Sequence, residues 1–382
     1  MMSNVTYKKL GEVATYVNGY AFKPETWSEK GLPIIRIQNL NNGEAAYNYY
    51  EGDLPAKFIV EKGDLLISWS ASLGSYFWQG EKAYLNQHIF KVVFDKSDID
   101  KTYLKYAVDA KLEEMKRKVH GATMQHIVKK DFDDTLIPVP SLEDQQRIVR
   151  ELDAIHAILA SKNEQLRELD KLAQAVFYDM FGDPITNEKG WEISTLGELF
   201  DIGSSKRVYQ SEWTNAGVPF YRAREVVKLA KDGFVDNDLF ITESLYSQYA
   251  AKYGVPVAGD ILVTAVGTLG VTYIVKDTDR FYYKDGNIIC LHQNGSPVDS
   301  IYVDFCFKTP FVREQIDNWS GATVGTFTIV KAKSTRIPLP PLDLQQAFAT
   351  KITAIEQQKE LIRASIAETE TLLAARMQHY FD

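Results

Sequence analysis

The segment IPVPSLEDQQ at residues 137–146 returns as IPLPPLDLQQ at residues 337–346, 200 positions later. In each copy a proline-rich boundary precedes a long run of helix-forming residues that begins with a Gln-Gln pair. Proline restricts the backbone, so each segment indicates a border between two kinds of structure. Its recurrence indicates that the chain contains two copies of one unit.

Shorter repeats extend the two copies over the whole chain. Residues 10–12 (LGE) recur at 196–198, residues 62–67 (KGDLLI) recur as AGDILV at 258–263, and residues 121–123 (GAT) recur at 321–323. The separation grows from 186 to 196 and then to 200 residues along the unit. This growth predicts insertions in loops of the second copy.

Each copy divides into a β-rich part and a helix. Short apolar runs bounded by Gly, Asn and Asp predict strands at 64–69, 89–94, 260–265 and 287–292, and a helical patch covers 102–119. We therefore expect an α+β protein with two pseudo-repeated α/β domains joined by two long antiparallel coiled-coil helices, with pseudo-twofold symmetry. The expected segments are a first domain at 1–140, a central helix and junction at 141–187, a second domain at 188–340 and a C-terminal helix at 341–382.

Apolar residues alternate at steps of four and three through both helical segments, which is the heptad pattern of a coiled coil. The seam comprises Ile148, Leu152, Ile155, Leu159, Leu166, Leu169, Val176 and Met180 in the first helix, and Phe348, Ile352, Ile355, Ile362, Ile366 and Leu373 in the second. Lys162 interrupts the first seam, and Lys359, Thr369 and Arg376 interrupt the second. Ser141 predicts the start of the first helix, and Gly182 its end.

A seam of this length needs a partner. Each helix of about 40 residues extends ~60 Å at ~1.5 Å per residue. The two helices predict an antiparallel pair with a globular domain near each end. The alternative is that each helix packs on its own domain.

Charge is unevenly distributed along the chain. The net charge of −8 by itself argues against a nucleic-acid partner, since phosphate contacts need Lys and Arg. However, residues 101–130 include eight basic and three acidic residues, and residues 206–231 include six basic and two acidic residues. These windows indicate a basic surface in each copy, although ordinary solvated faces give the same counts.

Several other classes of protein are disfavoured. Residues 1–10 lack the apolar core of a signal peptide, and the longest apolar stretch, 261–275, is too short and too polar to cross a bilayer. The sequence contains no phosphate-binding loop or amino-methyltransferase motif. Cys290 and Cys306 lie in apolar runs typical of a core, and His120 and His126 lack the partners of a zinc site. We expect a cytoplasmic protein that is not an enzyme and has no metal or cofactor of its own.

Together these segments resemble the specificity (S) subunit of type I restriction-modification systems. The resemblance covers the whole chain and is carried by residues 137–148, 337–346, 180–184 (MFGDP), 189–191 (KGW), 63–68 and 121–127. It implies two target recognition domains that each read a half-site of double-stranded DNA, with the helices fixing the spacer between half-sites.

The resemblance also implies partners in a bacterial or archaeal cell. They are methyltransferase (M) subunits, expected to number two, and restriction (R) subunits that translocate and cleave DNA. The complex would be an adenine-N6 DNA methyltransferase and ATP-dependent endonuclease. S-adenosylmethionine, ATP and Mg²⁺ would then lie on those partners.

Base reading needs hydrogen-bond donors and acceptors on loops, with Arg suited to guanine and Asn or Gln to adenine. We expect DNA contacts from residues that flank the repeated motifs. They are Arg36, Gln38, Asn39, Ser70, Gln87, Gln125, His126 and Lys129 in the first domain, and Arg222, Arg224, Thr264, Thr268, Asn287, Thr323, Thr326 and Lys331 in the second. Any one of them could instead be a solvated or turn-stabilising side chain.

Two details bear on these expectations. The second copy has Gly325-Thr326-Phe327 where the first has Gln125-His126-Ile127, so the two domains should read different half-sites. The main alternative function is a stand-alone, two-site DNA-binding or scaffold protein without M or R partners. A nuclease or methyltransferase in its own right is disfavoured by the missing motifs.

Overall fold

The computed structural model describes residues 5–42, 45–70, 72–118, 127–318 and 325–382. The predicted DNA contacts Gln125, His126 and Thr323 lie outside these residues. The chain forms two compact units. Unit 1 comprises Met1–Glu164 and Arg363–Asp382, and unit 2 comprises Gln165–Ile362. Each unit therefore takes part of both long helices.

Unit 1 contains two four-stranded sheets, ordered β2-β9-β6-β7 and β4-β3-β8-β5, and a pair formed by β1 and β10. Its elements are β1 (Thr6–Lys9), α1 (Leu10–Val13), β2 (Thr15–Asn18), η1 (Pro24–Thr26), β3 (Leu32–Ile35), α2 (Ile37–Asn41), β4 (Asn48–Tyr50), η2 (Ala56–Phe58), β5 (Ile59–Val60), β6 (Leu65–Ser68), β7 (Gly74–Phe77), β8 (Ala83–Leu85), β9 (Ile89–Val93), α3 (Lys101–Lys118), α4 (Lys129–Asp133), β10 (Leu136–Val139) and the first half of α5 (Leu142–Phe181).

The core of unit 1 follows from the two-residue period of β6. Leu65 and Ile67 point to one face, where they join a cluster that includes Tyr103 and Leu104 of α3. Leu66 points to the other face and joins the cluster of the smaller sheet. All three side chains are fully buried. Because β6 is covered on both faces, it reads as a continuous apolar run.

Unit 2 repeats this plan, with sheets β12-β19-β16-β17 and β13-β15-β14-β18 and a pair formed by β11 and β20. Its elements are β11 (Glu192–Thr195), α6 (Leu196–Leu199), β12 (Phe200–Gly203), η3 (Gln210–Glu212), β13 (Trp213–Thr214), β14 (Val218–Tyr221), α7 (Ala223–Asp232), β15 (Phe240–Ile241), α8 (Glu243–Tyr253), β16 (Ile261–Thr264), β17 (Thr272–Ile274), β18 (Tyr282–Tyr283), β19 (Ile288–Gln293), α9 (Ser300–Lys308), α10 (Pro310–Asn318), α11 (Ile329–Ser334), β20 (Arg336–Leu339) and α12 (Leu342–Phe381), whose second half belongs to unit 1.

The predicted strands are confirmed as β6, β9, β16 and β19, but the insertions of the second copy are not loops. They lengthen helices instead: α7 and α8 have 10 and 11 residues, where the first copy has α2 and η2 with five and three. Local signals explain both helices. The Thr242 hydroxyl caps α8 by accepting the Leu245 N–H at 3.2 Å, and Gly233 ends α7 at a φ of 76°.

The repeated Gln-Gln pair has a structural role in both units. Gln145 is buried and donates to the Pro140 carbonyl at 2.9 Å, while its oxygen accepts the Asp100 N–H at 2.9 Å. Gln345 makes the same two bonds, to Pro340 at 2.8 Å and from Asp299 at 2.9 Å. Each glutamine therefore fastens the start of a long helix to the segment that begins α3 or α9.

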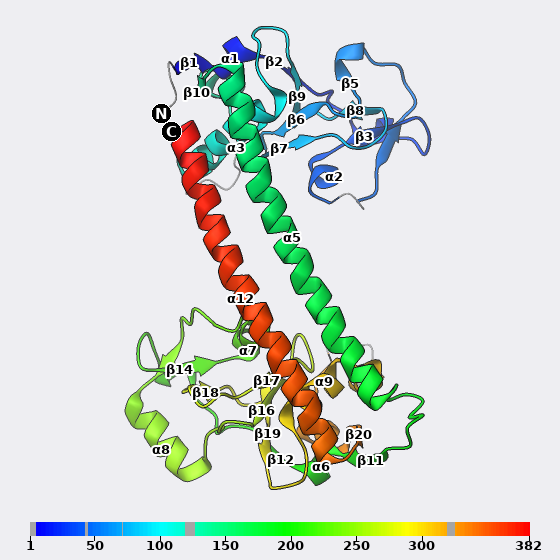
Figure 1. The fold of residues 1–382 in the computed structure, drawn as a ribbon, viewed down its shortest axis with the longest axis vertical. Coiled ribbons are helices and arrows are strands. Elements are labelled where there is room, and N and C mark those ends of the chain that lie inside the picture. Colours follow the sequence, from blue (N-terminus) through cyan, green and yellow to red (C-terminus); the bar gives the residue numbers. More distant parts are fainter. Residues whose placement is uncertain (1–4, 43–44, 71, 119–126, 319–324) are drawn as a thin grey trace. The chain divides into compact units, whose positions relative to one another are not determined.

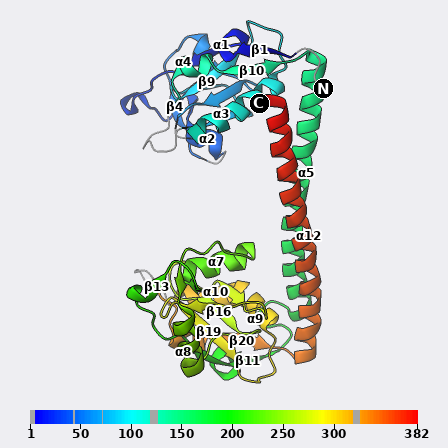
Figure 2. The same cartoon turned by 90° about the vertical axis from the view of Figure 1, so that its left-hand side faces the viewer.

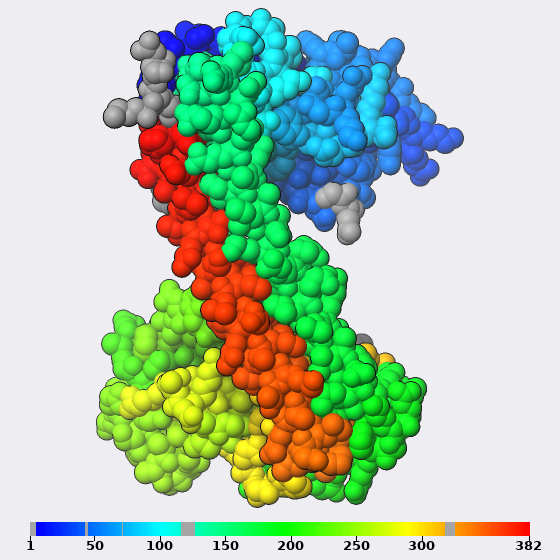
Figure 3. All heavy atoms as spheres, in the orientation of Figure 1, coloured from blue at the N-terminus to red at the C-terminus, as the bar shows by residue number. Residues whose placement is uncertain are grey.

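The two long helices pack against each other in both units, as Figures 1 and 2 show. In unit 1, Ile148 and Leu152 near the start of α5 share a cluster with Leu373, Tyr380 and Phe381 near the end of α12. The order is reversed in unit 2 (Figure 3), where Ala173 and Phe177 of α5 share a cluster with Phe348, Ile352 and Ile355 of α12. The helices are therefore antiparallel within each unit.

The predicted seam is largely shielded from solvent, although Phe177 and Phe181, which lie outside it, are more buried than several of its members. Every residue of the predicted seam is buried or half-buried. The ends of α5 also follow the sequence, since the Ser141 hydroxyl accepts the Asp144 N–H at 3.2 Å and Gly182 follows the helix at a φ of 75°. The expected α+β fold with paired long helices is confirmed.

Candidate nucleic-acid interface

Three strands of unit 1 begin or end at one edge of its larger sheet. Antiparallel pairing joins Asn18, the last residue of β2, to Phe90, and joins Ser68, the last residue of β6, to Ile89 at the start of β9. The loops after β2 and β6 and the loop before β9 therefore meet. We call this the strand-end edge of unit 1. It carries two predicted DNA contacts, Ser70 and Gln87.

The smaller sheet leads to the same edge. Strand β3 runs parallel to β8, and the Asn86 N–H donates to the Ile35 carbonyl at 3.2 Å. Arg36 follows β3 directly and so lies beside the segment that carries Gln87. Two predicted residues that are 51 positions apart in the sequence are thereby brought together.

A third part of the chain reaches the strand-end edge near Lys129. The Ile127 N–H donates to the Trp69 carbonyl at 3.2 Å. The Lys129 ammonium lies 5.5 Å from the centroid of the Phe90 ring and 2.7 Å from the Asp133 carboxylate. Lys129 is exposed, so its charge faces solvent although an acidic neighbour partly balances it.

Unit 2 builds the same edge from equivalent pairings. Thr264, the last residue of β16, pairs with Ile288 at the start of β19, and Gly203 of β12 pairs with Cys290. The Phe327 N–H donates to the Ala265 carbonyl at 3.0 Å, as Ile127 does to Trp69. The strand-end edge of unit 2 carries the predicted residues Arg222, Thr268, Asn287 and Thr326.

Arg36 is held in a defined orientation at its edge. Its Nη1 donates to the Asn48 Oδ1 at 3.1 Å, and its guanidinium lies 5.3 Å from the centroid of the Trp27 ring. A guanidinium has five N–H donors, so the bond to Asn48 does not exhaust its capacity. An arginine fixed in this way can present the two parallel donors that recognise guanine.

The corresponding arginines of unit 2 are oriented by carboxylates. Arg222 donates to Glu225 at 2.9 Å and to Asp238 at 3.0 Å, and Arg224 bonds to the same two carboxylates, with Asp238 at 2.9 Å. Burial alone would raise the pKa of Glu225, but the hydrogen bonds from Arg222 and Arg224 outweigh it and lower that pKa. The four side chains carry no net charge together, so this network contributes geometry more than attraction.

Two predicted contacts, Asn39 and Thr264, have structural roles instead. Asn39 is 4% exposed; its amide donates to the Ala45 carbonyl at 3.0 Å and its oxygen accepts the Arg36 N–H at 3.0 Å. Thr264 is fully buried, and its hydroxyl accepts the Val271 N–H at 2.9 Å and donates to the Thr268 carbonyl. Because both side chains are buried and bonded to nearby backbone, they are not available to a base.

The other predicted contacts differ in exposure. Gln38, Thr268 and Thr326 are exposed, Gln87 and Asn287 are half-buried, and Ser70 is buried. The Lys331 ammonium is half-buried and donates to the Thr326 carbonyl at 2.9 Å. The exposed and half-buried residues of this set are therefore the remaining candidates for base contact.

Four further side chains at these edges are not among the predicted DNA contacts. Trp69 donates its indole N–H to Asn18 at 3.2 Å and stacks on Phe90 at 5.7 Å, and His88 lies 5.6 Å from Trp69. In unit 2, Lys206 and Arg207 follow β12, and Arg207 lies 2.8 Å from Asp285. Their positions in the sequence could have identified them. Trp69 and His88 are adjacent to the predicted contacts Ser70 and Gln87, and Lys206 and Arg207 are the first residues of the basic segment 206–231.

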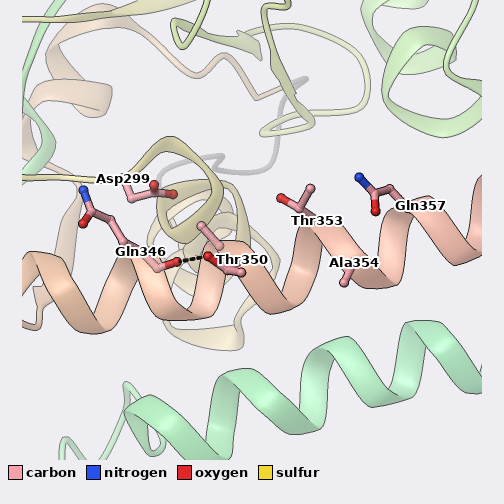
Figure 4. Close-up of a pocket in the computed structure, with 7 residues that line it drawn as sticks. Asp299, Gln346, Thr350, Thr353, Ala354 and Gln357 are labelled. Carbon is pink, nitrogen blue, oxygen red and sulfur yellow. Dashed lines mark hydrogen bonds between the residues drawn. The ribbon is translucent and has the colours of Figure 1, made fainter.

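A groove of 550 Å³ lies along α12 in unit 2 (Figure 4). Its lining is uncharged except for one residue and comprises Asp299, Gln346, Ala349, Thr350, Thr353, Ala354 and Gln357. The Thr350 hydroxyl donates to the Gln346 carbonyl at 2.9 Å, so it is turned back onto its own helix. Charged residues are depleted from the cores of protein interfaces, so a nearly uncharged helix face can form part of one.

A family model described as "type I restriction modification DNA specificity domain" matches residues 2–171 and 188–371. The chain belongs to this family. The two matched stretches coincide with the two copies of the repeat. Family membership identifies DNA sequence recognition as the role of the chain, and specificity subunits are themselves non-catalytic. Among the described residues, no helix has an apolar stretch long enough to cross a membrane.

Curated relatives match over nearly the whole chain. The EcoBI specificity subunit of Escherichia coli is 26% identical, with 93% of this chain and 77% of the relative covered. The MjaVIII specificity subunit of Methanocaldococcus jannaschii is 24% identical, with 95% and 88% covered. This specificity subunit is therefore similar to bacterial and archaeal relatives along its full length.

Two solved structures share the fold. The S subunit of a type I restriction-modification system from M. genitalium has a TM-score of 0.56 at 15% identity, with 99% of this chain and 96% of that chain covered. A chain from a study of complex assembly and conformational transition of the type I system has a TM-score of 0.61 at 16% identity, with 99% and 98% covered. At these identities the likeness is one of fold.

Proposed function

We propose that this specificity subunit reads a two-part DNA target, with one half-site at the strand-end edge of each unit. The observation that supports the proposal is that one edge is built twice with different side chains. Unit 1 has His88 where unit 2 has Asn287, since the Trp69 N–H donates to the first carbonyl and the Ala265 N–H to the second. Arg36 and Arg222 are equivalent arginines, but Asn48 orients the first and Glu225 the second. Asn can recognise adenine in a way that His88 cannot, so edges that differ at this position would select different short sequences.

Two short half-sites on one molecule are enough for specific binding. Once one edge is bound, the other searches only nearby DNA, so its effective concentration is high. The gain is lost when the half-sites are wrongly spaced. A chain with two edges would therefore select a fixed, unspecified spacer as well as the bases on either side of it.

We further propose that the chain directs methyltransferase and restriction subunits to this target. The uncharged groove on α12 supports a protein partner there, and we assign it to a methyltransferase subunit. S-adenosylmethionine, ATP and Mg²⁺ would be bound by these partners. The chain itself would then supply specificity and no chemistry.

The test is co-expression with a methyltransferase subunit of the same type I system, followed by mapping of modified bases in the host DNA. We expect adenine methylation in a split motif with a constant spacer. A parallel culture with Arg36→Gln should change one half of the motif, and another with Arg222→Gln should change the other half. Methylation of a continuous motif, or both variants altering the same half, would contradict the two-edge proposal. A soluble chain that neither binds a methyltransferase subunit nor gives new methylation would favour the stand-alone DNA-binding protein.

A further inference from the structure

Asp260, Cys290 and His292 lie together at the end of the larger sheet of unit 2 opposite to its strand-end edge. Asp260 directly precedes β16, while Cys290 and His292 lie on β19. The His292 Nδ1 is 2.7 Å from the Asp260 Oδ2, the Cys290 Sγ is 3.6 Å from the same nitrogen, and Sγ and Oδ2 are 4.0 Å apart. One atom from each side chain therefore converges on one small volume.

Comparison of the two copies shows what is unusual about this cluster. Asp64 is the equivalent of Asp260, and its carboxylate lies 2.6 Å from the Lys91 ammonium. Lys91 pairs with Leu66 in the sheet as Cys290 pairs with Leu262, so unit 2 has a thiol at the position of that cation. Two positions further, Val93 of unit 1 is replaced by His292. Unit 2 has thus lost the ammonium and gained two metal-ligand side chains around the same carboxylate.

We propose that Asp260, Cys290 and His292 bind a transition-metal ion of the zinc class. Thiolate, imidazole and carboxylate are the three protein ligands that zinc uses, at about 2.3, 2.0 and 2.0–2.2 Å. The ion supplies the positive charge that Lys91 supplies in unit 1. Binding converts the Cys290 thiol to a thiolate and releases its proton to solvent, and the neutral His292 ring carries its remaining proton on Nε2.

Burial and access fit this assignment. Cys290 is fully buried and Asp260 is 1% exposed, while the His292 side chain is 37% exposed. The site therefore opens to solvent on the histidine side, where an ion can enter and a water molecule can complete a tetrahedron. The second Asp260 oxygen accepts the Gln293 N–H at 3.0 Å, which keeps the carboxylate aimed at the cluster.

The test uses tag-free, full-length protein that has been stripped with a chelator and then supplied with Zn²⁺ or Co²⁺. We expect about one equivalent of bound zinc per chain and, with cobalt, the near-ultraviolet absorption of a cobalt–thiolate bond. His292→Gln and Cys290→Ser should each lose at least about tenfold in affinity. Cys306→Ala and His379→Gln remove another buried thiol and an exposed histidine, and both should bind as the parent does.

Either of two results would overturn the proposal: no cobalt–thiolate absorption in the parent protein, or undiminished zinc in His292→Gln. If Cys290→Ser does not fold, His292→Gln still tests the proposal. Because His292 is only half-buried, its replacement should leave the fold intact. The thermal midpoint of the parent should rise on adding Zn²⁺, since a ligand that binds only the folded state stabilises it. The cluster is at the end of the sheet opposite to the strand-end edge, so these readouts are independent of the proposed DNA recognition.

Discussion

The Lys359 ammonium lies 2.7 Å from the Asp170 carboxylate, across the helix pair of unit 2. A second carboxylate, that of Glu356, lies 2.7 Å from the same ammonium. Lys359 occupies a seam position and its side chain is 10% exposed, whereas both acidic side chains are largely in solvent. Burial tends to lower the pKa of Lys359, but the hydrogen bonds to Asp170 and Glu356 outweigh it and raise that pKa.

Replacing Asp170 by Asn should destabilise unit 2 by at most about 1 kcal/mol at neutral pH, because the lost carboxylate is exposed and screened. Since the folded-state pKa of Lys359 is raised, the pair stabilises the fold below the ordinary lysine value and its contribution is lost as pH rises through the folded value. Chemical denaturation at pH 7 and at about pH 11 checks both points. Asp179→Asn, on the same helix, is the control. A difference from the parent that persists undiminished in alkali would count against the ion pair.

The other seam lysine, Lys162, donates to the Ser365 hydroxyl in unit 1. Lys162→Leu should stabilise the helix pair by about 1 kcal/mol, because an apolar side chain replaces a half-buried ammonium. It should also loosen the register, since polar seam positions specify pairing. Thermal melts test stability, and methylation of targets with altered spacers tests register. An unchanged melting temperature would refute the first expectation, and an unchanged spacer the second.

Arg36→Gln should reduce methylation at targets with the correct first half-site by about 10- to 100-fold, as expected for one lost two-bond contact to a base. Binding of the methyltransferase subunit should not change. Arg147→Gln removes an exposed arginine from α5 and is the matched control. Equal loss in both variants would indicate general electrostatics and would remove Arg36 from the set of base contacts.

Glu225→Gln should disorder the two arginines of unit 2 and relax recognition of the second half-site. It should also destabilise the unit by about 1–3 kcal/mol at pH 7, the cost of removing a buried, charged hydrogen-bond acceptor. Because the folded-state pKa of Glu225 is lowered, the parent's advantage is present above the ordinary glutamate value and is lost as pH falls through the folded value. Urea titrations between about pH 3 and 7 follow this loss. An advantage that grows toward acid would contradict the sign.

Thr353→Arg places a long charged side chain in the groove on α12 and should reduce co-purification of the methyltransferase subunit with the full-length chain. DNA affinity of the isolated chain should be unchanged or slightly higher. Asn215→Arg adds the same charge on an exposed loop and controls for it. Normal assembly of the Thr353→Arg chain would show that the partner docks elsewhere.

Much of the fold follows from the sequence because its signals are local. A strand such as β6 is a short apolar run between turn residues, and α5 has its seam, its Ser141 cap and its Gly182 stop within one stretch. The repeat doubles every such signal. The insertions of the second copy were predicted to be loops, but they form helices. The sequence of α8 shows little apolar periodicity, so it does not indicate a helix.

The interface was harder to predict because side-chain partners are not local. Arg36 and Asn39 are both polar and only three residues apart. Arg36 is half-buried and bonds to the Asn48 side chain, whereas Asn39 is buried and its amide bonds to backbone carbonyls. Gln145 is repeated in the second copy, and a repeated polar residue can indicate a functional site. Its side chain is instead buried and donates to the Pro140 carbonyl, which is a structural role. Asp260 and Cys290 are 30 positions apart, and spacing rules for metal ligands do not find such a pair.

Strands β1 and β10 lie side by side in register, with Thr6 opposite Val139, and β11 and β20 do the same with Glu192 opposite Leu339. The segment from β1 to β10, and likewise that from β11 to β20, thus begins and ends at one place in the fold. The loops between the two strands can differ in sequence where they do not contact the helix that follows. Residues 137–146 and 337–346, which run from the second strand of each pair into the following helix, agree at six of ten positions. Loop changes between the paired strands would then alter the proposed DNA contacts and leave the proposed methyltransferase-binding face of α12 unchanged.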